Sequence, residues 1–321
     1  MSRTRWLKLA GFLAALSVQG EDLSPTFLED HGPALERLVH SLDPGMPGMA
    51  AIRMDWDAGR EQEALRQLDS IFSGIRRDTG VLEPLGFSED LEEAAEAALE
   101  DRFRILDRWE TVPRLSGGGL DWHHRGSRND KETAWMLNRH AFLPLLAEAH
   151  RQTGDARFRA QANRLIQDWL TANPYPDRYT FSGPWRPLEA ARRILHAWVH
   201  VWFDYTVLDK ETRLLMLASI PDHADALHQH ASFWGGNHLI TEKLGLLTLA
   251  YAWPEFAQSG QWQQDAEREL SGQILGQTYP DGSFKELSNH YQRVVLLNGQ
   301  YFLRLLAQLD PEYRDRPVAA R

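Results

Sequence analysis

A repeat of helix pairs along the second part of the chain constrains the fold most strongly. Helix signals begin near Thr133, Pro187, His238 and Asn289, at separations of 54, 51 and 51 residues. Each start opens a run of apolar residues at three- and four-residue spacing, and a return helix is predicted within each interval. Because every interval holds one antiparallel pair, the chain should build repeated αα-hairpins, arranged either as a solenoid or as a toroid.

Three return helices and an N-terminal group of helices complete the prediction. The return helices are expected at ARFRAQANRLIQDWL, at DKETRLLMLASI, which Pro221 should break, and at QWQQDAERELSGQIL. Residues 25–110 predict three or four helices with acidic surfaces, including SEDLEEAAEAALEDRFRIL, and alternating strand patterns are nearly absent. The polar, glycine-rich stretch RLSGGGLDWHHRGSRND, residues 114–130, predicts a long loop and a candidate functional segment.

Isolated polar residues interrupt the apolar surfaces of the first helix in each pair. They are Asn138 in helix 133–150, Glu189, Arg192 and His196 in helix 187–203, and Glu242 in helix 238–252, which is otherwise apolar nearly all round. A helix that is apolar on most of its surface is buried, so these helices are expected on the inside of the ring. The predicted fold class is therefore all-α, an incomplete α/α toroid over residues 21–321, with polar side chains converging at one end of its inner helices.

Composition limits the classes of function. Hydrophobic residues make up 43% and charged residues 25% of the chain, which is normal for a soluble globular protein. The net charge of −10 argues against a nucleic-acid partner, whose binding surface would be basic, although a local basic cluster could still bind an acidic ligand. The chain has no cysteine, which excludes disulfide and thiolate chemistry.

The N-terminal residues 1–20 resemble a secretory signal peptide. Arg3, Arg5 and Lys8 precede the short apolar run LAGFLAALSV and a small residue, Gly20. This pattern predicts a periplasmic or secreted protein, with a cytoplasmic amphipathic helix as the alternative. The run is too short to span a membrane, and no other segment approaches a transmembrane span.

Two motifs place amide, imidazole and phenol groups at predicted helix starts. The stretch FWGGNHLITEKLGLL brings Asn237 and His238 to the third inner helix, and YPDGSFKELSNHYQ brings His290 and Tyr291 to the fourth. Such a set, with arginines nearby, suits β-elimination at a uronic acid. An amide, imidazole or guanidinium group neutralises the C6 carboxylate, so that a base can remove the C5 proton. A tyrosine can protonate the leaving O4, and can act as the base where cations stabilise its phenolate.

Four motifs together resemble the heparinase II/III family of polysaccharide lyases. They are KETAWMLNRHAFLPLLAEAHRQTGD, GPWRPLEAARRILHAW, GGNHLITEKLGLLTLAYAWPEF and YPDGSFKELSNHYQ, which cover residues 120–308 in the order and with the spacing of that family. The resemblance implies an incomplete α/α toroid followed by a large β-sandwich, and a carbon–oxygen lyase acting on a uronate-containing polysaccharide such as heparan sulfate.

The resemblance also implies roles for the residues whose positions match the motifs of that family. The resemblance implies that Asn237 binds and neutralises the uronate carboxylate, assisted by His238, and that Tyr291 is the Brønsted acid and on some substrates also the base. The residues that would bind substrate or shape the cleft are Asn138, Arg139, Trp185, Glu189, Arg192 and His290. Glu242 is expected either to orient His238 one helical turn away or to form a buried ion pair.

No cofactor is expected within this chain. In the family, the β-sandwich contributes a histidine to the cleft and often a structural metal site. No β-rich segment occurs before Arg321, so a metal would belong to a C-terminal domain, which is expected to be lost or encoded separately as a partner. The spacing of His223, His228 and His230 does not place three ligands on one helix face and argues against a zinc site.

Two other classes of function compete with the lyase hypothesis. An inverting glycoside hydrolase would need two carboxyl groups across the cleft, and Glu242 with Glu286 or Asp281 is the available pair. A non-catalytic carbohydrate-binding domain is the other alternative. An ultraviolet-absorbing unsaturated product would distinguish a lyase from both.

Overall fold

The repeat of helix pairs is present in the structure, a computed structural model that describes residues 22–82, 90–181, 183–233, 235–310 and 312. The pairs are α6 (Phe142–Thr153) with α7 (Ala156–Ala172), a long helix over 187–203 with α10 (Lys210–His228), and α11 (Gly236–Ala252) with α12 (Ser259–Gln277), followed by α13 (Asn289–Leu309). The long helix consists of α8 (Pro187–Arg193), a π-helical turn (Ile194–Trp198) and α9 (Val199–Phe203).

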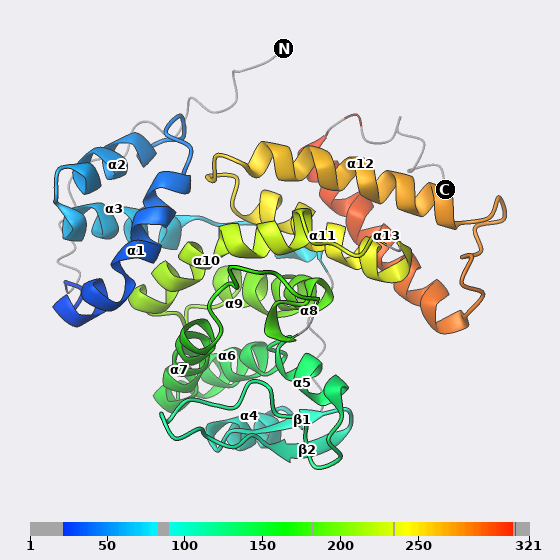
Figure 1. Cartoon of the computed structure of the whole chain (residues 1–321), viewed down its shortest axis with the longest axis horizontal. Helices are drawn as coiled ribbons and strands as arrows, with labels where there is room; N and C mark the ends of the chain where they lie inside the picture. The colour runs from blue at the N-terminus through cyan, green and yellow to red at the C-terminus, as the bar shows by residue number, and fades with distance from the viewer. Residues whose placement is uncertain (1–21, 83–89, 182, 234, 311, 313–321) are drawn as a thin grey trace.

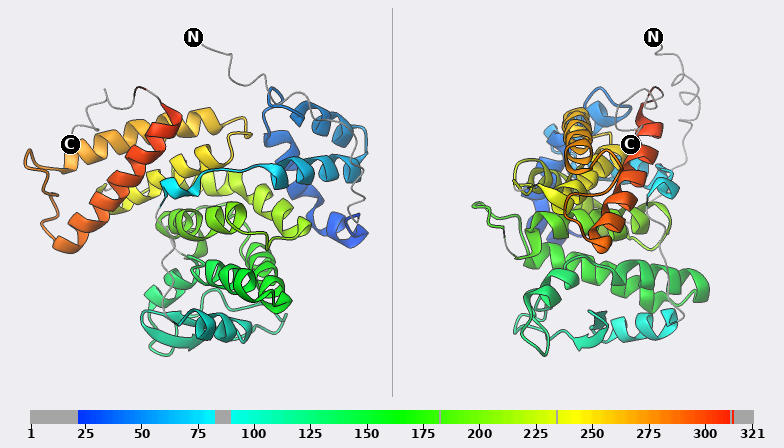
Figure 2. Two further views of the ribbon diagram at one scale, coloured as in Figure 1. Left: turned by 180° about the vertical axis from the view of Figure 1, so that it is seen from behind. Right: turned by 90° about the vertical axis from the view of Figure 1, so that its right-hand side faces the viewer.

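The helices form two rows, and this arrangement is the α/α toroid that the sequence predicts. In the inner row α11 packs against both α8 and α13, and α6 packs against α9, while in the outer row α10 packs against α7 and α12. Figure 1 and Figure 2 show α11 lying between α12 and the helix formed by α8 and α9. Because α11 has neighbours on most sides, nearly all of its side chains from Leu239 to Ala250 are buried, polar ones included.

The prediction of one continuous inner helix over 133–150 is wrong, because two separate helices cover this range. Helix α5 (Lys131–Leu137) ends at Asn138, whose side-chain amide donates to the carbonyl of Ala134 at 2.8 Å. His140 then adopts a left-handed conformation with φ of 60°, before α6 begins. A side chain that bonds the last turn and a left-handed residue both end a helix without disturbing its apolar periodicity.

The predicted break at Pro221 is also wrong, since α10 continues through this residue to His228. Proline inside a helix removes one backbone hydrogen bond and costs about 3 kcal/mol. Helix α10 packs against α1 (Pro25–Ser41) on one side and against α7, α8 and α11 on others, and most of its side chains are buried. This packing outweighs the local penalty.

The N-terminal part contains the predicted helices and one hairpin that was not predicted. The helices are α1, α2 (Met49–Asp57), α3 (Glu61–Gly74), a 3-10 turn (Thr79–Val81) and α4 (Leu91–Leu99). Strands β1 (Arg102–Ile105) and β2 (Arg108–Thr111) follow α4, in a segment expected to be helical. Phe103 and Ile105 alternate with more exposed residues on β1, which buries one face of the hairpin.

The loop over 114–130 is present and is tied to the outer row. The backbone N–H of Leu120 and the indole N–H of Trp122 both donate to Asp168 Oδ2 of α7, at 3.0 and 2.9 Å. Leu120 and Trp122 are fully buried. The middle of the loop therefore belongs to the core, and its polar ends remain at the surface.

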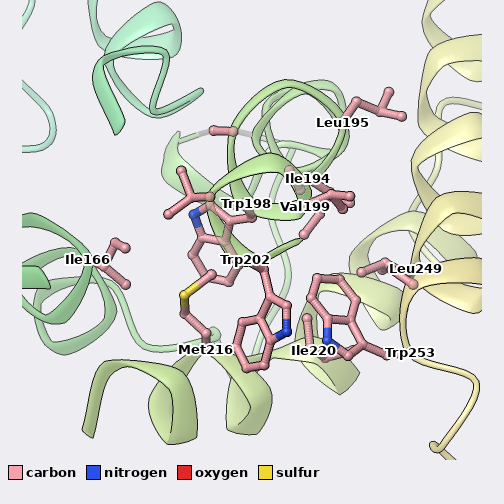
Figure 3. Packing of buried hydrophobic residues seen from close by; sticks show 14 of the residues in the cluster. Ile166, Ile194, Leu195, Trp198, Val199, Trp202, Met216, Ile220, Leu249 and Trp253 are labelled. Carbon is pink, nitrogen blue, oxygen red and sulfur yellow. The ribbon is translucent and has the colours of Figure 1, made fainter. Parts of the chain in front are cut away.

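Aromatic residues and one arginine fill the space between the rows. Figure 3 shows Trp198, Trp202 and Trp253 packed together among aliphatic side chains. Beside them the fully buried Arg193 lies with its guanidinium carbon 4.0 Å from the centre of the Trp169 ring. Its Nη1 donates to the carbonyl of Asn138 at 2.7 Å, so the arginine ties α8 to the end of α5.

Candidate active site at the rim of the inner helices

The inner helices α8, α11 and α13 begin on the same side of the molecule. In Figure 1 their N-terminal ends lie toward the right-hand side. The first turns of these helices contain the predicted site residues Glu189, Asn237, His238, His290 and Tyr291. Helix N-termini carry exposed backbone N–H groups and the positive end of the helix dipole. This rim is therefore suited to bind an anionic ligand.

Asn237 already holds a carboxylate at the start of α11. Its backbone N–H donates to Glu286 Oε1 at 3.2 Å, and its Nδ2 lies 3.1 and 3.2 Å from the two carboxylate oxygens. Gly236 has φ of 77°, and a Cβ there would lie 3.1 Å from Glu286 Oε1. Glycine thus gives the turn its left-handed conformation and leaves room for the carboxylate. We call this arrangement the Asn237 carboxylate site.

Glu242 anchors the segment that leads to this site. Its two oxygens accept from the backbone N–H and from the hydroxyl of Ser232, each at 2.7 Å. Only 1% of Glu242 is exposed, and this burial raises the pKa of its carboxyl group, an effect that the bonds from Ser232 partly offset. The carboxylate therefore fixes the chain before Gly235, whereas we expected it to orient His238 or to form a buried ion pair.

His238 is half-buried next to Asn237 and lies in a mixed electrostatic field. Burial lowers the pKa of its imidazole, and the positive charges of Arg186 and Arg139 lower it further, while Glu189 and Glu286 act in the opposite direction. The imidazole is therefore neutral at neutral pH, in which form one ring nitrogen donates and the other accepts a hydrogen bond.

Two arginines share one buried carboxylate at the start of α8. Glu189 is fully buried, and it accepts a 2.7 Å hydrogen bond from Arg139 Nε and a second one from Arg186. The guanidinium carbon of Arg186 lies 3.9 Å from the centre of the Trp135 ring. Two positive charges against one negative charge leave the group cationic. Arg186 was not among the predicted site residues, although the motif PWRPLE places it directly before the helix start.

A cavity of about 290 Å³ lies beside this arginine pair. Trp135, His123, Arg125 and Lys131 contribute to its walls, and Lys131 Nζ lies 4.9 Å from the centre of the Trp135 ring. An aromatic wall flanked by cations can hold a sugar ring that carries a negative charge. The polar 114–130 loop thus contributes His123 and Arg125 to the rim.

Tyr291 and His290 lie in the first turn of α13, after the N-cap Ser288. Tyr291 is 39% exposed, and its ring meets that of His290 edge-on at 5.2 Å.

A buried hydrogen-bond chain fixes α13 against α11. Asn298 Nδ2 donates to Thr241 Oγ1 at 2.8 Å, and this hydroxyl donates to the carbonyl of Asn237 at 3.0 Å.

Three other predicted site residues are hydrogen-bonded to neighbouring groups of the protein. The amide of Asn138 is buried, donating to the carbonyls of Trp122 and Ala134 and accepting from Trp169. Trp185 is 5% exposed and donates to the carbonyl of Asn173 at 2.9 Å. Arg192 donates to His196 Nε2 at 2.8 Å, and burial, followed by the charge of Arg192, lowers the pKa of that histidine to about 3.

The histidines of the DHADALHQH segment have separate partners. His223 Nε2 accepts from Arg193 at 3.0 Å, His228 contacts Asp265 at 2.9 Å, and His230 stacks on Tyr179 with 3.9 Å between ring centres. Across the part of the chain that the structure describes, no three His, Asp or Glu side chains are grouped to hold a metal ion. Over the same residues, every helix is too short or too polar to cross a membrane.

Comparison with known proteins assigns the chain to one family. A family model described as the heparinase II/III N-terminus matches residues 38–313. The heparin-sulfate lyase of Bacteroides thetaiotaomicron is 25% identical over 270 residues, which are 79% of this chain and 38% of that enzyme. The heparin-sulfate lyase of Bacteroides stercoris is 22% identical over 272 residues, covering 78% and 40%. The chain thus spans about two fifths of the length of these curated relatives.

Solved structures share the fold. A crystal structure of heparinase III aligns with a TM-score of 0.76 at 22% identity, over 87% of this chain and 45% of that one. A heparan sulfate lyase HepC mutant from Pedobacter heparinus aligns with a TM-score of 0.71 at 21% identity, over 86% and 45%. These alignments confirm the toroid, and the family-model match confirms the resemblance found in the motifs. The chain belongs to the heparinase II/III N-terminal family.

Proposed function

We propose that this chain provides the uronate-binding and proton-transfer residues of a polysaccharide lyase that cleaves by β-elimination. The observation that supports this most directly is the Asn237 carboxylate site, in which an amide and a backbone N–H hold the carboxylate of Glu286. The same donors can hold the C6 carboxylate of a uronic acid. Donors fixed where negative charge develops stabilise the transition state without reorganising, and this lowers the barrier to removing the C5 proton.

Tyr291 and His238 are the residues that we assign to proton transfer. Tyr291 is exposed at the first turn of α13, five residues after Glu286, whose carboxylate contacts Asn237, and a phenol can protonate the leaving O4. His238 follows Asn237 directly in the chain, and its lowered pKa keeps the imidazole neutral and able to accept a proton. The bond between C4 and O4 breaks as the C5 proton leaves, which gives an unsaturated uronate end and a new hydroxyl end.

The surroundings of the site favour an acidic polymer as substrate. Arg139 and Arg186 leave a net positive charge around Glu189, and the adjoining cavity is lined by Trp135, Lys131 and Arg125. A second charged sugar of the same polymer fits these groups. We therefore propose a glycosaminoglycan of the heparan sulfate type, or a related uronate polymer, as the substrate.

The geometry does not favour the hydrolase alternative. An inverting hydrolase needs two accessible carboxyl groups that flank the scissile bond. Glu242 is 1% exposed with both oxygens bonded to Ser232, and Asp281 accepts from Ser283 within its own turn. Glu242 belongs to both candidate pairs, with Glu286 and with Asp281, and its buried carboxyl group cannot flank a scissile bond.

The test is an assay for the unsaturated product by its ultraviolet absorbance, with heparan sulfate as substrate. The chain is assayed alone and after adding the β-sandwich of a family member as a separate polypeptide. Replacing Tyr291 by Phe should lower kcat by about 10²–10⁴-fold because it removes the proton donor. Asn237→Ala should lower it by about 10²–10³-fold because it removes the carboxylate donor.

Two results would contradict the proposal. Unchanged kcat in Tyr291→Phe would remove the tyrosine from the reaction. Tight binding of heparan sulfate without product, in both forms of the assay, would favour the non-catalytic carbohydrate-binding alternative. Circular dichroism of each variant checks that its helical fold is intact.

A further inference from the structure

We propose that Glu286 is a specificity residue: an internal carboxylate that occupies the Asn237 carboxylate site until the carboxylate of the substrate displaces it. This inference rests on the proposed function of the same site. The contact joins residues 49 positions apart, from the start of α11 and from the loop before α13. It is therefore a tertiary interaction and not a local turn.

The hydrogen bonds to Glu286 are longer and more exposed than those to Glu242, a carboxylate on the same helix as Asn237. The bonds from Asn237 to Glu286 measure 3.1 to 3.2 Å and are exposed to solvent. Hydrogen bonds to a carboxylate usually measure about 2.7–2.9 Å when they are strong. Glu242, by contrast, accepts two 2.7 Å bonds from Ser232 in the interior. Short, buried bonds therefore fix Glu242 in place, whereas a ligand can replace Glu286 in its longer, exposed bonds.

Glu286 and a substrate carboxylate cannot share the site at low cost. Both groups need the backbone N–H and the side-chain amide of Asn237, and both carry a negative charge. Unit charges about 4 Å apart repel each other even in bulk water, by an energy that corresponds to roughly a five-fold change in affinity, and by more near a protein surface. Binding of a uronate therefore requires the Glu286 side chain to move away.

The loop that carries Glu286 allows this movement. Phe284, two residues earlier, is 1% exposed and pairs with Thr278, and Ser288, two residues later, caps α13. Between these two anchors, Glu286 and Leu287 are exposed, Leu287 by 79%. The Glu286 side chain can rotate into solvent while both anchors, and with them the start of α13, stay in place.

The expected consequence is selection for polymers over small acids. Competition with Glu286 lowers the affinity of a free uronate and of a polymer by the same factor, but a free uronate offers little beyond its carboxylate and is then bound too weakly to occupy the site. A polymer also gains contacts from neighbouring sugars in the cavity beside Arg186 and Trp135. The internal carboxylate thus reduces occupancy of the site by abundant small carboxylic acids.

The test compares Glu286→Gln and Glu286→Ala with the unchanged chain. Binding of glucuronate and of a heparan sulfate oligosaccharide is measured by calorimetry, and KM and kcat are measured by product absorbance. Both variants should bind glucuronate at least about five-fold more tightly, because both remove the competing charge. KM for the polymer should fall by a similar factor, because its uronate displaces the same side chain, and kcat should be retained. Asp281→Asn is the matched control, since it removes one charge from the same loop without touching Asn237.

Two outcomes would overturn the inference. Unchanged or weaker glucuronate binding in both variants would show that Glu286 does not compete with the ligand. A kcat that falls in Glu286→Ala and is restored in Glu286→Gln would show that Glu286 positions Asn237 instead. The calorimetric result stands apart from the lyase assignment: if no variant forms an unsaturated product but both bind glucuronate more tightly, the lyase assignment fails and the displacement of Glu286 is supported.

Discussion

Asp222 is a half-buried carboxyl group between α10 and α1, on the wall of a cavity of about 650 Å³. Burial raises its pKa to about 6; Arg37 acts to lower it, and Asp225 adds to the increase. Its pKa in an unfolded chain is 3.8. A carboxyl group with a raised pKa binds its proton more tightly in the folded state, so its ionised form destabilises the fold at neutral pH.

We predict that Asp222→Asn raises the free energy of unfolding at pH 7.5 but has little effect at pH 4. Above pH 6 the carboxylate is charged in both states, and the shift corresponds to at most about 3 kcal/mol, which partial exposure reduces to about 1–2 kcal/mol. As the pH falls from 6 to 3.8 the folded state takes up the proton first, and the penalty disappears. Urea denaturation at the two pH values measures the difference.

The exposed Asp30 on the same cavity provides the control for Asp222. Asp30→Asn removes the same charge from a solvated position and should change stability by less than about 0.5 kcal/mol at either pH. Equal stabilisation by Asp222→Asn at pH 7.5 and pH 4 would show that ionisation is not the cause.

At the scale of elements, the close contact between α11 and α8 depends on one glycine. A Cβ at Gly245 would lie 2.9 Å from the Cβ of Ala191 and 3.0 Å from its Cα. Distances this short leave no room for a methyl group without moving one helix. Small residues at this crossing therefore set how closely the two inner helices approach each other.

We predict that Gly245→Ala destabilises the protein by about 1–3 kcal/mol, although alanine is the better helix former. Gly272, inside the outer helix α12, is the matched control, because nothing lies within 4 Å of a Cβ placed there. Gly272→Ala should stabilise by up to about 1 kcal/mol. Thermal unfolding of the two variants gives opposite shifts if the inner contact is as close as described, and a gain in stability from Gly245→Ala would contradict it.

The success of sequence-based prediction differed between elements for physical reasons. Helices 187–203 and α13 begin where predicted, because Pro187 and the N-cap Ser288 mark their starts and long apolar periods follow. The break at Asn138 was missed, since a side-chain cap and a left-handed histidine leave the periodicity unchanged. Strands of four residues, as in β1, are too short to show a clear alternation.

For the candidate site, local signals identified residues but not their partners. The pair of glycines before Asn237 marks a turn, and the sequence alone indicates that its amide lies at a helix start. Its contact with Glu286 depends on how α11 and α13 pack, which involves residues 49 positions apart. The burial of Asn138 and Trp185 likewise follows from tertiary packing, which periodicity does not resolve.

At the scale of the molecule, a net charge of −10 coexists with a cationic rim. The starts of three inner helices and the Arg139–Glu189–Arg186 group lie in this region, whereas acidic residues dominate the chain as a whole. An acidic polymer is therefore repelled by most of the surface and attracted locally. Its orientation during binding should follow this asymmetry.

We predict that heparan sulfate binding weakens as salt is raised from about 0.05 M to 1 M, where screening shortens to about 3 Å. Arg186→Gln should weaken binding at low salt and have little effect at high salt. Arg268→Gln, on the outer helix α12 and 68% exposed in its side chain, should match the unchanged chain at both concentrations. Calorimetric titration measures the affinities, and an Arg186→Gln effect that is independent of salt would contradict an electrostatic role.

The π-helical turn at 194–198 has a consequence for how the toroid tolerates change. Val199 donates its backbone N–H to Ile194, five residues back, so this turn holds one residue more than a regular α-helix. One residue corresponds to a rotation of about 100° about the helix axis. Deleting a residue here would restore a regular helix. It would also rotate the start of that helix relative to Trp198 and Trp202, and this rotation would turn Glu189 away from Arg139. The extra residue thus lets one helix match two unrelated environments, the polar rim at its start and the tryptophan core at its end.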